Sequence, residues 1–119
     1  MGQMRLKRIG EEIKKIISTM IQSGEIKDPR VSTLTSITEV DVTEDFKYAY
    51  VYVSVLMGDK EAALKGLKSA SGFIRKEVGR DIKLRYTPEI VFKLDDSIER
   101  GIYMSKLIDK LKDEEGNND

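Results

Sequence analysis

Apolar residues recur at helical spacing over the first part of the chain and then change to the alternating spacing of strands. From residue 6 to residue 21 they return every three or four positions, with charged residues between them. This period predicts an amphipathic helix that buries one face. Gly24 is suited to end it, and Asp28-Pro29-Arg30 predicts a turn, because proline cannot continue a helix. The apolar positions are Leu6, Ile9, Ile13, Ile16, Ile17, Met20 and Ile21.

Two strands are predicted next. Residues 33–42 are rich in Thr, Ile and Val, and the step from Leu34 to Ile37 breaks the alternation and indicates a bulge. After a turn at residues 43–46, residues 47–56 alternate small or branched apolar side chains with tyrosines. We expect an antiparallel hairpin from these two strands. Its core candidates are Leu34, Val40, Val42, Ala49, Val51, Val53 and Val55, and its other face carries Tyr48, Tyr50 and Tyr52.

Residues 60–85 follow a helical pattern that is interrupted by Ser69-Ala70-Ser71-Gly72. Gly72 costs about 1 kcal/mol relative to alanine inside a helix, and the serines compete for backbone hydrogen bonds. We therefore predict a kink near residues 70–72, where small side chains would let another backbone approach closely. Asp59 is the candidate N-cap. The apolar face holds Ala63, Leu64, Leu67, Ile74 and Val78, and the opposite face holds Lys65, Lys68, Ser69, Gly72, Lys76 and Arg80.

The last third of the chain completes the set of elements. Residues 82–86 and 89–94 are both expected to be extended, with a regular strand that starts after Pro88. A capping box from Asp96 to Glu99 predicts a final helix, whose core candidates are Ile98, Ile102, Met104, Ile108 and Leu111. This order predicts an α+β fold, with helices against one face of a three-stranded sheet. We expect one domain over residues 1–112 and an acidic, disordered tail over residues 113–119.

Charge is distributed unevenly along a chain that has no net charge. Residues 60–85 hold eight basic and three acidic residues, a net charge of +5, and residues 1–31 carry +3. Residues 32–59 and 86–119 each carry −4. Because affinity for phosphate follows local charge, the basic segment is a candidate for RNA binding. The alternative is a helix face that is charged only for solubility.

Several chemistries are excluded by residues that the chain lacks. It has no cysteine and no histidine, so zinc sites built on them and the usual Cys-His or Ser-His-Asp systems cannot form. The acidic pairs Asp95-Asp96 and Glu114-Glu115 diverge on a strand or tail, and we expect no catalysis, no metal and no cofactor. No apolar run reaches the roughly 20 residues that span a bilayer. We expect a cytoplasmic protein with no membrane role.

Five segments, taken in order, resemble the ribosome-binding factor A family over residues 4–111. Alone, each would be weak, but their order makes the resemblance specific. They are Arg5-Leu6-Lys7-Arg8-Ile9-Gly10-Glu11-Glu12-Ile13, Tyr48-Ala49-Tyr50-Val51-Tyr52-Val53, Ala70-Ser71-Gly72-Phe73-Ile74-Arg75, Leu84-Arg85-Tyr86-Thr87-Pro88-Glu89-Ile90, and Asp96-Ser97-Ile98 with Met104-Ser105.

The resemblance implies a type II KH-like fold in which a helix-kink-helix with Ala-x-Gly, here Ala70-Ser71-Gly72, replaces the Gly-x-x-Gly loop. It also implies binding to the free or immature 30S subunit and its 16S rRNA, and help with late maturation and processing of that RNA, with importance at low temperature. We expect a monomer when the protein is free. A KH-like adaptor that binds a protein through the tyrosine face or the acidic residues 32–59 is the alternative.

Basic residues that flank the kink are our candidates for phosphate contacts, because an ordinary KH domain clamps RNA with the loop that this chain lacks. For Ala70, Ser71 and Gly72 we expect a shaping role rather than direct contact. The predicted RNA-binding residues are Lys65, Lys68, Arg75, Lys76 and Arg80, extended by Arg5, Arg8, Lys83 and Arg85.

Overall fold

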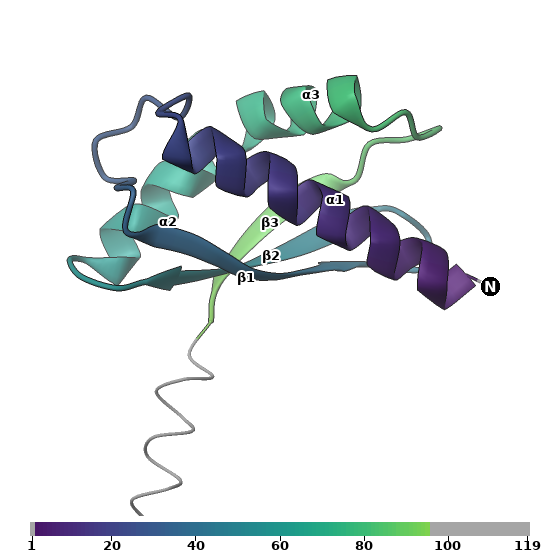
Figure 1. The fold of residues 1–119 in the computed structure, drawn as a ribbon, viewed down its shortest axis with the longest axis horizontal. Coiled ribbons are helices and arrows are strands. Elements are labelled where there is room, and N and C mark those ends of the chain that lie inside the picture. Colours follow the sequence, from purple (N-terminus) through teal and green to yellow (C-terminus); the bar gives the residue numbers. More distant parts are fainter. Residues whose placement is uncertain (1, 96–119) are drawn as a thin grey trace, which may run out of the picture.

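The computed structural model describes residues 2–95, which form three helices and a three-stranded sheet (Figure 1). This α+β architecture confirms the predicted fold class. In chain order the elements are α1 (Gly2–Gln22), β1 (Thr35–Val42), β2 (Tyr48–Val55), α2 (Lys60–Ser69), α3 (Ser71–Asp81) and β3 (Glu89–Leu94). The predicted last helix and the predicted tail lie outside the described residues.

The sheet has the order β1-β2-β3, so β2 is its central strand. β1 and β2 are antiparallel, as expected for a hairpin, and β2 and β3 are parallel. A parallel pair needs a long crossover, and α2 with α3 supplies it. The bulge in β1 lies between Ile37 and Glu39, so Thr38 is the extra residue and the irregularity comes slightly later than predicted.

The helices cover one face of the sheet, with α1 lying along β1 (Figure 1). The apolar stripe of α1 is buried there, and Ile13 and Ile17 are fully enclosed. Every second residue of β2, from Ala49 to Val55, faces the same core. Leu34 is a wrong core prediction, because it precedes β1 and is 45% exposed. The apolar faces of α1 and of the strands therefore pack together in one layer between the helix and the sheet.

Two glycines show how closely the chain packs. Gly24 ends α1 with φ of +76°, a conformation that a side chain disfavours. Gly10 lies on the buried face of α1, where a Cβ atom would come within 2.6 Å of the carbonyl oxygen of Val40. α1 can therefore approach β1 this closely only because residue 10 has no side chain.

A break divides the basic helical segment at Ala70, which has φ of −90° and ψ of 0° and separates α2 from α3. Asp59 caps α2 as predicted, since its carboxylate accepts a hydrogen bond from the backbone N–H of Ala62. The expected close approach at Gly72 is wrong, because a Cβ there would meet no atom within 4 Å. Close approach occurs instead at Gly66, where a Cβ would lie 2.8 Å from Val31 Cγ2.

The connection over residues 82–88 is irregular and forms no strand, contrary to the extended segment expected for residues 82–86. Pro88 is buried at its end, and β3 begins at the next residue. The backbone N–H of Glu89 donates to the carbonyl oxygen of Lys47 at 2.8 Å. This bond ties the start of β3 to the β1–β2 turn.

Candidate nucleic-acid interface

The basic side chains predicted to bind RNA are all exposed, which is the first requirement for contact with phosphate. They come from α1, α2, α3 and the 82–88 connection. Some flank the break between α2 and α3, whereas Arg5 and Arg85 line a groove beside the start of α1. The predicted residues are Arg5, Arg8, Lys65, Lys68, Arg75, Lys76, Arg80, Lys83 and Arg85.

One group flanks the break between α2 and α3. Over residues 2–95, no carboxylate forms an ion pair within 4.0 Å of the ammonium group of Lys65, Lys68 or Lys76. Arg80 differs, because its Nη1 lies 3.4 Å from Oε1 of Glu77 on the same helix. The three lysines are thus cations without an internal partner in the described part of the chain. Their charge is available to an external anion.

Arg75 is held by the chain itself. Its Nε and Nη2 donate to the carbonyl oxygen of Thr87 at 3.3 and 2.9 Å. A guanidinium group has five N–H donors, so further donors remain for another acceptor. The contact nevertheless gives Arg75 a positioning role for the 82–88 connection, which the sequence did not indicate.

A second group lies near the other end of α1. Arg5 and Arg85 line one groove together with Phe46 and Tyr86. The break lies beside the loop that follows α1, whereas this groove lies beside the beginning of α1 (Figure 1). The two grooves therefore lie beside opposite ends of α1, and α3 runs between the break and the connection that carries Arg85.

The break is supported by the loop between α1 and β1. Arg30 holds Asp28 in a fork, with Nη2 to Oδ2 at 2.6 Å and Nε to Oδ1 at 2.9 Å, and this lowers the pKa of Asp28 to about 2. Arg30 Nη2 also reaches Ser69 Oγ at 3.4 Å. The same loop and the break line a shallow groove of about 500 Å³ that includes Phe73, which is 47% exposed. The fork fixes the loop against the end of α2.

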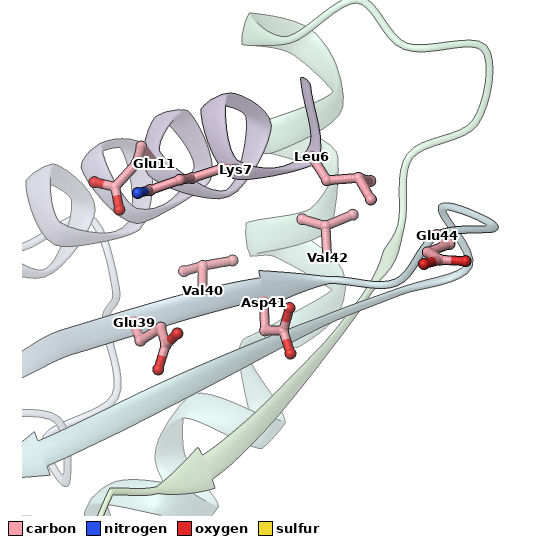
Figure 2. A pocket seen from close by; sticks show the side chains of 8 residues that line it. All are labelled: Leu6, Lys7, Glu11, Glu39, Val40, Asp41, Val42 and Glu44. Carbon is pink, nitrogen blue, oxygen red and sulfur yellow. The ribbon is translucent and has the colours of Figure 1, made fainter. Parts of the chain in front are cut away.

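Negative charge collects along the edge strand β1. A groove of about 340 Å³ between α1 and β1 is lined by Lys7 and by four carboxylates (Figure 2). Figure 2 shows Val40 and Val42 directed toward α1, and Glu39 and Asp41 directed away from it. Such an edge repels phosphate. The four carboxylates belong to Glu11, Glu39, Asp41 and Glu44.

The tyrosines lie on the sheet face that α1, α2 and α3 leave open, next to these carboxylates. Across the strands, Tyr50 pairs with Asp41 and Tyr52 with Glu39. Tyr48 and Tyr50 stack with their ring centroids 6.1 Å apart, and Lys93 Nζ lies 4.5 Å from the centroid of Tyr50. The rings could stack bases, but the neighbouring carboxylates disfavour an RNA backbone. This face fits a cationic partner better.

Two further classes of site are absent from residues 2–95. These residues contain no group of three or more Asp or Glu side chains placed to hold a metal ion. None of the helices described by the structure is long and apolar enough to cross a membrane.

Comparison with known proteins identifies the family. A family model described as ribosome-binding factor A matches residues 5–108. The chain belongs to this family. A ribosome-binding factor A of Clostridioides difficile is 61% identical over 109 residues, which cover 92% of this chain and 86% of the relative. The family resemblance predicted from the five ordered segments is therefore confirmed.

Solved structures of this family share the fold. The crystal structure of ribosome-binding factor A from Thermus thermophilus gives a TM-score of 0.67 at 24% identity, covering 75% of this chain and 94% of that one. A homology model of the Thermus thermophilus factor, fitted into a cryo-EM map of its 30S complex, gives 0.60 at 23% identity, covering 73% and 91%. Identities this low establish the common architecture alone.

Sequence reasoning missed the aromatic members of the two grooves. The residue pattern puts Phe46 in a turn and Tyr86 in an extended segment, and neither position suggests a site on its own. The sequence singles out Phe73 only as a member of one of the five segments that resemble the family. A signal is nevertheless present, since an arginine directly precedes Tyr86 and a lysine directly follows Phe46. Only the folded chain shows that Arg5 joins them.

Proposed function

We propose that this protein is an assembly factor that binds the free or immature 30S ribosomal subunit and contacts its 16S rRNA. The observation that carries the proposal is the group of unpaired lysines at the break, Lys65, Lys68 and Lys76. Family membership supports it, and so does the 30S complex of the Thermus thermophilus factor, to whose structure this fold is similar. The protein would act in the cytoplasm, as a monomer when free, without a cofactor and without catalysis.

The lysines at the break would hold rRNA phosphates, because each contact releases counterions from the RNA. Ala70 sets the angle between α2 and α3, with Ser71 and Gly72 opening α3, so this segment aims the lysines rather than clamping nucleotides. In that sense the helix-kink-helix would stand in for the Gly-x-x-Gly loop of a type II KH domain. The domain would extend over residues 1–112, with residues 113–119 as an acidic tail.

Binding would stabilise one local conformation of the rRNA. A protein shifts such an equilibrium only by preferring one state, so the factor would favour the rRNA conformation that late processing and folding require. The benefit would be largest at low temperature, where alternative RNA pairings persist longest. We therefore assign it a role in late 16S rRNA maturation that is important in the cold.

A second candidate function is that of an adaptor for a protein partner. The open sheet face favours it, because its tyrosines lie beside exposed carboxylates. A basic polypeptide would complement this face, whereas RNA would not. The adaptor would need the tyrosine face and would be indifferent to the lysines at the break.

Sedimentation separates the two functions. Purified protein is mixed with isolated 30S particles and centrifuged through gradients at low and moderate salt. The assembly factor must migrate with the particles, and the bound fraction must fall as salt rises. Protein that stays at the top of the gradient at every salt concentration would exclude 30S binding and favour the adaptor. Crosslinking on the particle would then map the rRNA contacts.

A further inference from the structure

The groove beside the start of α1 combines arginines with aromatic rings. It has a volume of about 290 Å³ and is built from three segments that are distant in the sequence: α1, the β1–β2 turn and the 82–88 connection. Its lining side chains are Arg5, Asp45, Phe46, Leu84, Arg85 and Tyr86. The two arginines are among the RNA contacts predicted from the sequence, but neither that prediction nor the proposed function gives the rings a role.

Each arginine lies over a ring at the distance of a cation–π contact. The Cζ atom of Arg5 lies 5.6 Å from the ring centroid of Phe46, and that of Arg85 lies 5.6 Å from the centroid of Tyr86. A guanidinium group has five N–H donors, and a ring beneath it leaves donors for other acceptors. Over residues 2–95, neither arginine has a carboxylate within 4.0 Å. The guanidinium groups of Arg5 and Arg85 therefore have N–H donors that can bind a phosphate.

The two rings differ in their surroundings. Tyr86 is 68% exposed, so its ring is accessible to solvent. Phe46 is half-buried against the core and has φ of +60°, a backbone conformation that is unfavourable for a residue with a Cβ atom. The turn thus keeps an aromatic side chain at a position that would suit glycine or asparagine.

Main-chain bonds hold the two sides of the groove together. Glu89 N donates to Lys47 O at 2.8 Å, which joins the connection to the turn. From the other side, Arg75 fixes the carbonyl group of Thr87, the residue after Tyr86. The rings are therefore presented by a braced scaffold rather than by a free loop.

We propose that this groove binds one unstacked nucleotide of single-stranded RNA, with its base against Tyr86 and the adjoining phosphates at Arg5 and Arg85. The inference rests on the proposed function and adds to it a subsite separate from the groove at the break. Unstacked bases bind aromatic rings and guanidinium planes, and arginine forks match phosphate. Asp45, whose Oδ1 accepts hydrogen bonds from Thr43 Oγ1 and Lys47 N, keeps its charge on the rim and can accept from the amino group of a base.

The test uses the full chain with a tryptophan in place of Tyr86. The chain has no native tryptophan, so Tyr86→Trp places its single tryptophan in the groove, where that emission can be excited selectively. Titration with the single-stranded RNA hexamers oligo(A) and oligo(U) should quench its emission. A control variant, Tyr48→Trp, carries the emitter on the carboxylate-bearing sheet face and should not be quenched.

Affinity provides a second readout. Tyr86→Leu should weaken binding of a labelled hexamer about tenfold with an unchanged salt slope, whereas Tyr86→Phe should stay within about twofold of the wild type. Arg85→Gln should instead reduce the salt slope by about 0.7, the value for one phosphate contact on a single strand. Tyr86 is exposed, so its replacement should leave the unfolding temperature nearly unchanged, and this is measured alongside.

The outcomes distinguish the groove from the proposed function. If the emission of Tyr86→Trp is not quenched and Tyr86→Leu binds RNA as the wild type does, while reversal of the lysines at the break abolishes 30S binding, the groove proposal is overturned and the proposed function stands. If Tyr86→Leu weakens 30S binding and no hexamer binds, the groove holds something other than a single-stranded nucleotide and the proposal is equally overturned. If wild-type protein binds hexamers but does not bind 30S particles, the proposed function is overturned and the groove proposal stands.

Discussion

Arg75 and Thr87 are joined by a forked contact, in which one guanidinium group donates twice to one main-chain carbonyl oxygen at 2.9 and 3.3 Å. The contact connects the outer surface of α3 to the irregular connection that carries Arg85 and Tyr86. α3 also packs tightly here, since a Cβ at Gly79 would lie 2.7 Å from Thr87 Oγ1. A residue predicted as an RNA contact therefore also organises the neighbouring groove.

Replacing Arg75 with lysine should loosen the 82–88 connection. Lysine cannot reproduce the fork, and the loss of a partly exposed charged hydrogen bond should lower the free energy of unfolding by about 1 kcal/mol. The hydrogen-bonded backbone amides of Leu84 and Glu89 should exchange with solvent faster, as hydrogen exchange followed by NMR would measure. Arg80→Lys is the matched control, because its exposed ion pair with Glu77 contributes little. Equal exchange in both variants would rule out the bracing role.

Two glycine substitutions should change the free energy of unfolding in opposite directions. Gly10→Ala places a Cβ against the carbonyl oxygen of Val40, a backbone atom that cannot move away cheaply, and should lower the free energy of unfolding by about 2 kcal/mol. Gly72→Ala meets open space within α3 and should raise it by about 0.5–1 kcal/mol. Urea unfolding measures both. A destabilised Gly72→Ala would show that the residue is needed to shape the break.

Regular periodicity explains why most of the fold could be predicted from the sequence. The stripe that contains Ile13 and Ile17 could only be a buried helix face, and the alternation from Ala49 to Val55 could only be a half-buried strand. The core prediction for Leu34 is wrong because an apolar residue just outside a strand has no such periodic constraint. Its exposure depends on how the preceding loop runs, which is a tertiary property.

Contacts between distant segments explain what could not be predicted. The small residues around Gly72 suggested a close approach, but the approach is at Gly66, where the α1–β1 loop packs on α2. Helical spacing correctly placed Lys65, Lys68 and Lys76 on the exposed face. It could not show that Arg75 would be held by Thr87, because that acceptor is a main-chain carbonyl group and leaves no trace in the residue pattern.

Acid should weaken the structure through Asp28. Arg30 lowers the pKa of this carboxyl group from 3.8 to about 2, mainly by a side-chain hydrogen bond. A lowered pKa means that the folded state holds the charged form more strongly, so the stabilisation is complete above about pH 4 and is lost as the pH falls toward 2. Asp28→Asn should therefore narrow the difference in stability between pH 5 and pH 2. Urea unfolding of both proteins across this range measures it, and parallel pH profiles would contradict the assignment.

Reversal of two unpaired lysines at the break should weaken 30S binding and flatten its salt dependence. Lys68→Glu with Lys76→Glu removes two candidate phosphate contacts, and each should lower the slope of log K against log salt by about 0.7–0.9. Lys7→Glu with Lys15→Glu changes the net charge equally on the exposed side of α1 and is the matched control. If the slope falls by the same amount in both variants, binding follows net charge rather than a defined surface. If only the reversal at the break changes it, the phosphates lie beside α2 and α3.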